Sequence, residues 1–221
     1  MNIILVGAPG AGKGTISTFL KREYQIPYLS TGDVFRAEIQ KRTELGLLAK
    51  QLIDQGNFIP DDITIRMVKK ALSEMKEGFL LDGFPRNLPQ VHAFETFLQE
   101  TGMQLDLVLH LDVNDSIILN RLMHRQVCPS CQATYHKIDI PPKREGLCDY
   151  CRSNLITRED DKPEHIENRL NIYHSTTKPI ITYYKERGLL SSIKVDCSVQ
   201  ELYDRVQVVL KKERLIGGEQ C

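Results

Sequence analysis

The sequence predicts an α/β fold in which a five-stranded parallel sheet is covered by helices on both faces. Two observations carry this prediction: five short apolar runs, and the helical patterns that separate them. Strands of a parallel sheet are buried on both faces and read as nearly continuous apolar runs, and each needs a crossover helix to reach the next. The runs lie at residues 2–6, 27–29, 78–81, 105–111 and 192–195.

The helical patterns also show where the alternation of strands and helices is interrupted. A long helix opens at Pro163, and we expect a bend near Pro179, because proline has no N–H to donate within a helix. Residues 31 to about 60 contain helical patterns without a strand, which predicts a small helical insert. Residues 126 to about 160 are rich in Cys, Pro, Gly and polar residues, so this segment cannot easily build an apolar core.

Composition argues against several classes of function. The chain of 221 residues carries 29 Lys+Arg against 29 Asp+Glu, so it has no overall charge with which to grip nucleic acid or an anionic membrane. No apolar run approaches the length of a membrane span, and Met1 leads directly into the first strand without a signal peptide. We therefore expect a cytoplasmic protein without nucleic-acid or membrane partners.

The most informative motif is GAPGAGKGT at residues 7–15, directly after the first apolar run. A strand, a glycine-rich loop with lysine and a following helix make the context of a phosphate-binding loop, or P-loop. Glycines let successive backbone N–H groups point at one centre, and the helix adds its positive end. Lys13 supplies a mobile positive charge, and Thr15 a hydroxyl. The sequence thus predicts a three-layer α/β/α P-loop fold with a nucleoside triphosphate site.

Four of the six cysteines form two C-x-x-C pairs, separated by sixteen residues. In a reducing cytoplasm this spacing indicates zinc rather than disulfides. Because four thiolates complete a tetrahedron, no position is left open for water, and the zinc would be structural. A zinc ribbon that touches nucleic acid is the alternative, but the segment has few aromatic and only scattered basic residues. The predicted ligands are Cys128, Cys131, Cys148 and Cys151.

Further motifs follow the P-loop in a specific order. They are STGD at 30–33 with Arg36, LDGFPR at 81–86 with Gln90, Arg121 to Arg125, TREDD at 157–161, and Arg169. With these motifs the chain resembles the adenylate kinase family over essentially its whole length, and in particular the bacterial form with a long, zinc-bearing lid. The resemblance implies reversible phosphoryl transfer from MgATP to AMP, which yields two ADP and serves purine nucleotide homeostasis.

The resemblance also implies a division into three parts. Residues 1–29, 60–121 and 162–221 would form the core P-loop domain. Residues 30–59 would be the domain that binds the nucleoside monophosphate, and residues 122–161 a lid with structural Zn²⁺. Mg²⁺ would enter with ATP. We expect a monomer, because the substrate domains must swing freely.

For ATP, the resemblance implies contacts from the P-loop, two arginines, part of the lid and one late residue. Arg121 and Arg125 are four residues apart, so we expect them on one face of a helix, pointing together at the triphosphate. The implied ATP residues are Gly10, Ala11, Gly12, Lys13, Gly14, Thr15, Arg121, Arg125, Thr134, Tyr135 and Val199.

For AMP, Thr31 would lie beside the adenine and Gln90 would read its edge through the side-chain amide. Arginine forks suit bidentate contact with phosphate oxygens. The implied AMP residues are Thr31, Arg36, Asn57, Phe58, Ile59, Gly83, Phe84, Pro85, Arg86, Gln90, Arg158 and Arg169. The residues expected to take part in catalysis are Lys13, Arg86, Arg125, Arg158, Arg169 and Asp160.

Two alternatives stay open at this point. Within the same class, the chain could be a relative that accepts pyrimidine monophosphates or uses GTP. The long cysteine-bearing lid and Thr31 speak against the pyrimidine version. From another class, it could be a nucleic-acid-binding zinc protein with a regulatory P-loop. Neutral charge and the lack of a basic stripe speak against this reading.

Overall fold

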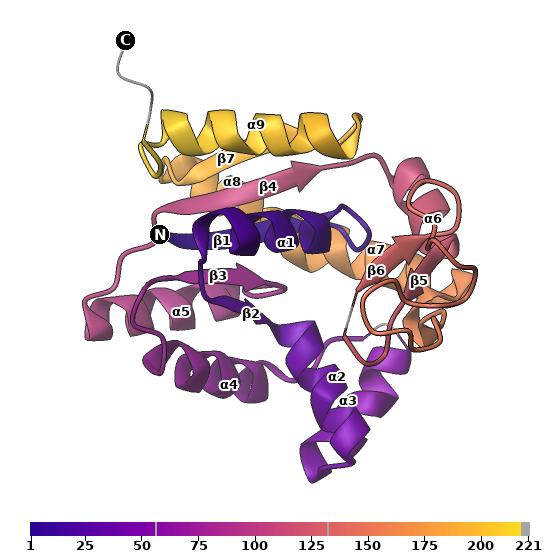
Figure 1. Cartoon of the computed structure of the whole chain (residues 1–221). Helices are drawn as coiled ribbons and strands as arrows, with labels where there is room; N and C mark the ends of the chain where they lie inside the picture. The colour runs from indigo at the N-terminus through magenta and orange to yellow at the C-terminus, as the bar shows by residue number, and fades with distance from the viewer. Residues whose placement is uncertain (56, 132, 218–221) are drawn as a thin grey trace.

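The computed structural model describes residues 1–55, 57–131 and 133–217. Five strands form one sheet in the order β2-β3-β1-β4-β7, and all neighbours run parallel (Figure 1). This confirms the predicted α/β fold with its five-stranded parallel sheet. The strands are β1 (Asn2–Gly7), β2 (Tyr28–Ser30), β3 (Phe79–Asp82), β4 (Leu107–Asp112) and β7 (Leu190–Lys194).

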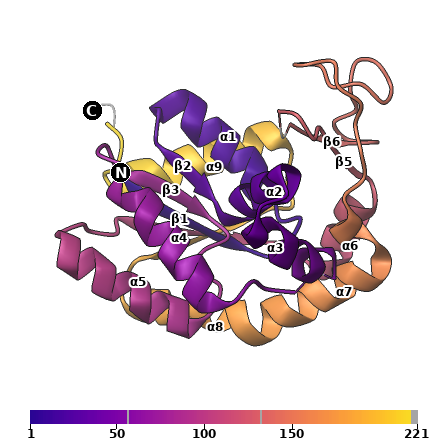
Figure 2. The same cartoon turned by 90° about the horizontal axis from the view of Figure 1, so that it is seen from below.

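Side chains of the central strand alternate between two hydrophobic cores. Ile3 and Leu5 pack on one face of the sheet, Ile4 and Val6 on the other, and all four are buried. The first face is covered by α1 (Lys13–Tyr24) and α9 (Val199–Lys212). The second face is covered by α4 (Asp61–Ser73), α5 (Leu88–Thr101) and α8 (Lys178–Glu186), as Figure 2 shows. The result is three layers with the sheet in the middle.

The predicted helical insert follows β2. It consists of α2 (Thr31–Lys41) and α3 (Glu44–Asp54), and it has a small core of its own around Phe35, Ala49 and Ile59. The insert begins at Ser30, whose side chain accepts a hydrogen bond from the backbone N–H of Asp33. The start of the insert is thus fixed at the carboxyl end of β2.

The lid segment starts where α6 (Asp115–Met123) ends. Arg125 begins β5 (Arg125–Val127), which pairs antiparallel with β6 (Thr134–His136). The prediction that Arg121 and Arg125 share one helix face is therefore wrong. Pairing of Arg125 with His136 draws the chain out of the helix after Met123, so the two arginines lie on different elements.

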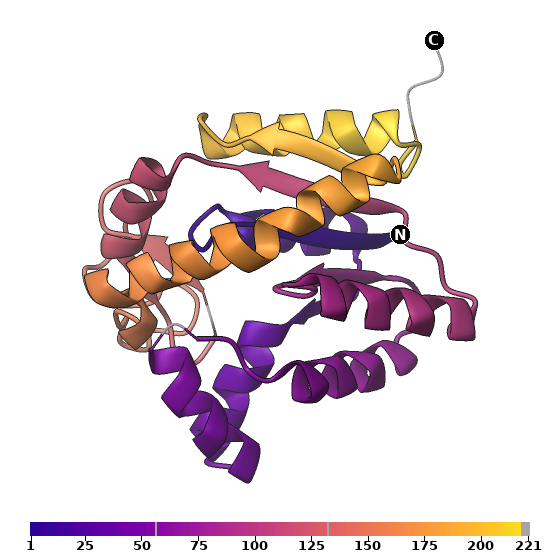
Figure 3. The ribbon, with the colours of Figure 1, turned by 180° about the vertical axis from the view of Figure 1, so that it is seen from behind.

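A long helical segment crosses the back of the sheet (Figure 3). It begins as α7 (Pro163–Ile172), passes through one turn of π-helix at Tyr173–Thr177 and continues as α8. The π-turn ends two residues before Pro179, near which a bend was predicted. Pro179 offers no N–H to the preceding turn, and a wider turn accommodates this loss.

The helices have the lengths usual in globular domains. The longest, α5 and α9, have 14 residues each. Within the described residues, no helix is both long and apolar enough to cross a membrane.

Candidate active site

The P-loop lies at the carboxyl edge of the sheet, between β1 and α1. Gly10 and Gly12 adopt φ angles of 78° and 99°, a region that residues with a side chain rarely adopt. Gly12 caps the N-terminus of α1, so the positive end of this helix faces the loop. The Nζ atom of Lys13 donates hydrogen bonds to the carbonyls of Gly7 at 2.8 Å and Ala8 at 3.0 Å. The lysine thereby reaches back across the loop.

Electrostatics at Lys13 favour an added negative charge. Burial lowers the pKa of Lys13 to about 8, and Arg86 and Arg169 act in the same direction, while Asp82 opposes them. Burial likewise raises the pKa of Asp82, at the end of β3, against the opposing effect of Lys13. The ammonium group therefore lies in surroundings that compensate its charge only in part.

Five arginines from separate parts of the chain gather with Lys13. Each comes from a different element or loop, and their common charged neighbour is Asp160, in the 3₁₀ turn Glu159–Asp161. They are Arg36 on α2, Arg86 after β3, Arg125 on β5, Arg158 before the 3₁₀ turn and Arg169 on α7.

Asp160 and Asp161 hold two of these arginines in place. Arg125 donates through Nε and Nη2 to the two oxygens of Asp161, at 2.8 and 2.5 Å. The Nη1 atom of Arg169 lies 3.0 Å from oxygens of both carboxylates. The side chain of Asp161 is 0% exposed, so it is the central acid of the cluster. Asp160, the acid expected to take part in catalysis, supports Arg169 beside it.

The cluster as a whole retains surplus positive charge. Burial lowers the pKa of Arg86, Arg158 and Arg169, but a guanidinium group stays protonated at neutral pH. Although burial acts to raise the pKa of Asp160, Arg169 and Arg125 hold it below its usual value. Among the described residues, the buried Nε atoms of Arg36 and Arg158 have no hydrogen-bond partner. These donors and this charge suit an anion with several oxygens.

Thr31 and Arg86 meet at one carbonyl. The hydroxyl of Thr31 donates to the carbonyl of Gly83 at 2.9 Å, and Nε of Arg86 donates to the same oxygen at 2.6 Å. The guanidinium of Arg86 lies 4.9 Å from the ring centre of Phe58, a cation–π contact. The structure thus brings together four of the residues that were predicted to bind AMP.

Gln90 is buried and held at both ends of its amide. Its Oε1 accepts from the backbone N–H of Arg86 at 2.8 Å, and its Nε2 donates to Asp61 at 2.6 Å. Asp61 also accepts from Asn87. Sequence reasoning missed this role of Asp61, because no local pattern links the start of α4 to α5.

Other predicted residues lie at the margins of the cluster. Ile59 and Phe84 are buried in hydrophobic cores, so their side chains do not reach the arginines. Asn57 accepts a hydrogen bond from Asn168 at 3.0 Å. Arg121 points to the carbonyl of Val195 at 3.5 Å. The remaining positions are Pro85 beside Arg86, Gly14 and Thr15 in the first turn of α1, Val199 at the start of α9, and Thr134 on β6.

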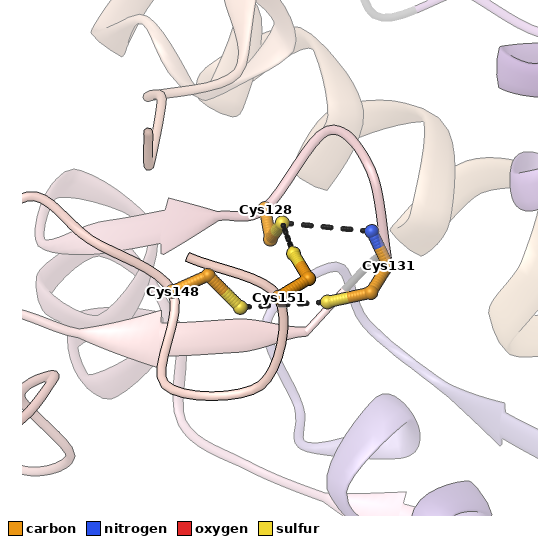
Figure 4. A group of neighbouring side chains, drawn as sticks. All are labelled: Cys128, Cys131, Cys148 and Cys151. Atoms are coloured by element: carbon orange, nitrogen blue, oxygen red, sulfur yellow. Dashed lines mark hydrogen bonds between the residues drawn. The ribbon is translucent and has the colours of Figure 1, made fainter. Parts of the chain in front are cut away.

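The four predicted zinc ligands converge in the lid (Figure 4). Their Sγ atoms all lie within 4.8 Å of one another, with the closest pairs, Cys128–Cys151 and Cys131–Cys148, at 3.3 and 3.4 Å. A Zn–S distance of about 2.3 Å places tetrahedral sulfurs about 3.8 Å apart. The donor set and its spacing therefore fit a four-thiolate zinc site.

The side chain of Tyr135 belongs to this cysteine cluster. It is buried, its hydroxyl accepts from the backbone N–H of Asp149 at 2.7 Å, and it lies 3.5 Å from Sγ of Cys148. Tyr135 was predicted to contact ATP. Because the side chain of Tyr135 packs against the cysteines, only its backbone could contact ATP.

A P-loop that faces more buried cations than carboxylates defines the class of protein: a P-loop protein that handles nucleotide phosphates. A sequence model described as adenylate kinase matches residues 5–189. The chain belongs to the adenylate kinase family.

Curated relatives extend this likeness over nearly the whole chain. An adenylate kinase of Lachnoclostridium phytofermentans is 45% identical over 214 residues, which cover 96% of this chain and 99% of the relative. An adenylate kinase of Caldicellulosiruptor bescii is 46% identical, with 96% and 98% covered. One of Streptomyces avermitilis is 45% identical, again with 96% and 98% covered.

The lowered pKa of Lys13 predicts proton uptake on nucleotide binding. In the free protein, Lys13 loses its proton as the pH rises through about 8, whereas a bound polyphosphate raises the pKa and restores the charge. Calorimetric titration with ATP in buffers of different ionisation enthalpy measures this uptake. We expect it to increase between pH 7.5 and pH 9, toward about one proton per ATP.

The matched variant is Lys13→Arg, which keeps a charge that does not titrate in this range. We expect it to lose the pH-dependent uptake, while Lys70→Met, at an exposed position of α4, retains it. Uptake that stays constant over the pH range in the wild-type protein would contradict the assignment.

Proposed function

We propose that the chain is an adenylate kinase that transfers the terminal phosphoryl group of MgATP to AMP, reversibly, to give two ADP. The observation that supports this most strongly is the convergence of Lys13 with five arginines, two of which have buried Nε donors without partners. Phosphoryl transfer requires alignment and neutralisation of charge more than covalent help from the protein. This arrangement supplies both.

On the donor side, the amides of residues 10–15 would hold the β- and γ-phosphates of ATP. Lys13 would exchange its two carbonyl partners for phosphate oxygens and follow the charge as the group moves. Arg125 and Arg169, fixed by Asp161, would flank the transferred group without having to reorient. Thr15, Arg121, Thr134, Tyr135 and Val199 stay proposals for contacts with the rest of ATP.

On the acceptor side, Arg36 and Arg86 would bind the phosphate of AMP, with Arg158 between the two nucleotides. Thr31 and Gln90 would face the adenine. Each Gln90 amide group already has one protein partner, which fixes its orientation and leaves one further hydrogen-bonding position on Oε1 and one on Nε2. Asn57, Ile59 and Phe84 would contribute through their backbone.

Exclusion of water supports the same reading. The insert and the lid touch directly: the Nε2 atom of Gln40 donates to the carbonyl of Pro129 at 3.0 Å. A site covered in this way favours transfer to AMP over transfer to water. We infer that residues 30–59 and 122–161 act as the two movable domains around a core of residues 1–29, 60–121 and 162–221.

Mg²⁺ fits the donor chemistry beside the P-loop. Asp82 offers a carboxylate and Thr15 a hydroxyl, and hard cations prefer oxygen ligands while they keep several waters. The ion neutralises phosphate charge when bound. Asp82 would face it and orient its waters.

Zn²⁺ would be held by Cys128, Cys131, Cys148 and Cys151 and would supply structural stability. The cluster has only a small apolar core, in which Tyr135 packs with Cys128 and Cys148, so a metal would provide the stability that hydrophobic burial does not.

We further propose that the enzyme is cytoplasmic and monomeric, and that its partners are ATP, AMP and ADP.

An acceptor panel tests the proposed function. We expect a coupled assay with ATP to give a kcat/KM for AMP at least about tenfold above those for CMP, UMP and GMP, because a site built to hydrogen-bond one base rejects others. Preference for CMP or UMP would establish the pyrimidine alternative and overturn the proposal. GTP in place of ATP tests the choice of donor.

Two variants show that the activity belongs to this site. Arg86→Ala should lower kcat/KM by at least about a thousandfold for every acceptor, because it removes a guanidinium from the phosphate. Arg22→Ala, which breaks an exposed pair with Glu23, should change nothing. Circular dichroism confirms that both variants fold.

The zinc proposal predicts a separate effect on stability. Removal of metal by a chelator, or the Cys148→Ser substitution, should lower Tm by roughly 10 °C, while the rate at low temperature falls much less. Cys197→Ser, outside the cluster, should leave Tm unchanged. Purified protein that contains no zinc and has all four thiols freely titratable would contradict the proposal.

A further inference from the structure

The π-turn between α7 and α8 carries two buried polar side chains, of which one contacts a residue of the site. Tyr173 and Thr177 are its first and last residues, and both are buried. The hydroxyl of Tyr173 lies 3.3 Å from Nε2 of His110, on β4. The hydroxyl of Thr177 donates to the backbone carbonyl of Arg86 at 2.8 Å. A buried polar group usually keeps such a partner, because the loss of one partner leaves the other unsatisfied.

The contact of Thr177 completes the fixation of Arg86. The backbone N–H of Arg86 donates to Gln90 at 2.8 Å, and its Nε donates to Gly83 at 2.6 Å. Thr177 adds the third point, at the carbonyl, and reaches it from 91 residues further along the chain. Without this bond, the backbone of Arg86 would still be held by Gln90 at its N–H but no longer by Thr177 at its carbonyl.

The turn also links two arginines of the site. Arg169 lies on α7, one helical turn before Tyr173, and its guanidinium is held by Asp160 and Asp161. Thr177 is the last residue of the π-turn that follows α7. π-Turns carry an extra residue and are often found at functional sites. We therefore expect a function of this turn beyond the accommodation of Pro179.

We propose that Thr177 is a positioning residue for Arg86, through which the α7–α8 segment fixes the acceptor arginine in register with Arg169. The inference rests on the proposed role of Arg86 in binding the phosphate of AMP. Thr177 itself touches no substrate. Its effect is to hold the Arg86 backbone so that the guanidinium does not have to be ordered when AMP binds.

Thr177→Val tests the inference, because it preserves the shape of the side chain and removes the donor. We expect kcat/KM for AMP to fall about five- to tenfold, the range of one net hydrogen bond. The KM for ATP should stay within about twofold, because Lys13 and Arg125 do not depend on this contact. Thr177→Ser, which retains the hydroxyl, should restore kcat/KM for AMP to within about twofold of wild type.

The matched control lies next to it in the same turn. Thr176 is half-buried, and its hydroxyl donates to the carbonyl of Ile172 within the helical segment, at 2.7 Å. Thr176→Val should therefore leave the kinetics for both substrates within about twofold of wild type. A general effect of valine on the turn would appear in both variants, whereas a positioning effect appears only at Thr177.

Three results would overturn the inference: unchanged kcat/KM for AMP in Thr177→Val, equal losses for ATP and AMP, or failure of Thr177→Ser to restore activity. If Thr177→Val does not fold, Thr177→Ala and Thr177→Ser make the same comparison, and equal activity of these two overturns it. The proposed function fails separately, if the wild-type protein does not phosphorylate AMP.

Discussion

The structure depends on the balance between buried positive charge and the two carboxylates that organise it. Asp161 has no exposed side-chain surface and pairs with both Arg125 and Arg169, and Asp160 adds a second contact to Arg169. These pairs orient the arginines without neutralising the whole cluster, because Lys13, Arg86 and Arg158 contribute further charge. A buried ion pair gains stability only when its geometry and hydrogen bonds are good. Under the proposed function, the remaining surplus of positive charge would give the site its affinity for phosphate.

The rest of the fold serves to bring these charges to one place. Parallel strands end at one edge of the sheet, so the P-loop after β1 and Arg86 after β3 meet there. The helical insert adds Arg36, and the lid segment adds Arg125 and Arg158. Residues that are far apart along the chain thus lie close together in space. Under the proposed function, the insert and the lid would carry charges that become useful only when both cover the site.

Much of this could be predicted from the sequence, because the decisive signals are local. The order of apolar runs and helices gave the sheet, residues 7–15 gave the P-loop, and the two C-x-x-C pairs gave the cysteine cluster. Helix periodicity failed at Arg125, because pairing with His136 overrides it. Bonds such as Asp61 to Gln90 and Thr177 to Arg86 leave no local pattern at all. They depend on how distant elements pack, which periodicity does not encode.

We propose that one continuous cationic interior binds two nucleotides end to end. The most direct test is the change in Tm on addition of two adenosines joined by five phosphates, compared with the analogue joined by three. We expect saturating pentaphosphate compound to raise Tm by about 5–10 °C, and the triphosphate compound to raise it far less, because its linker is too short to bridge both phosphate sites. An equal shift with both compounds, or none with either, would contradict the account.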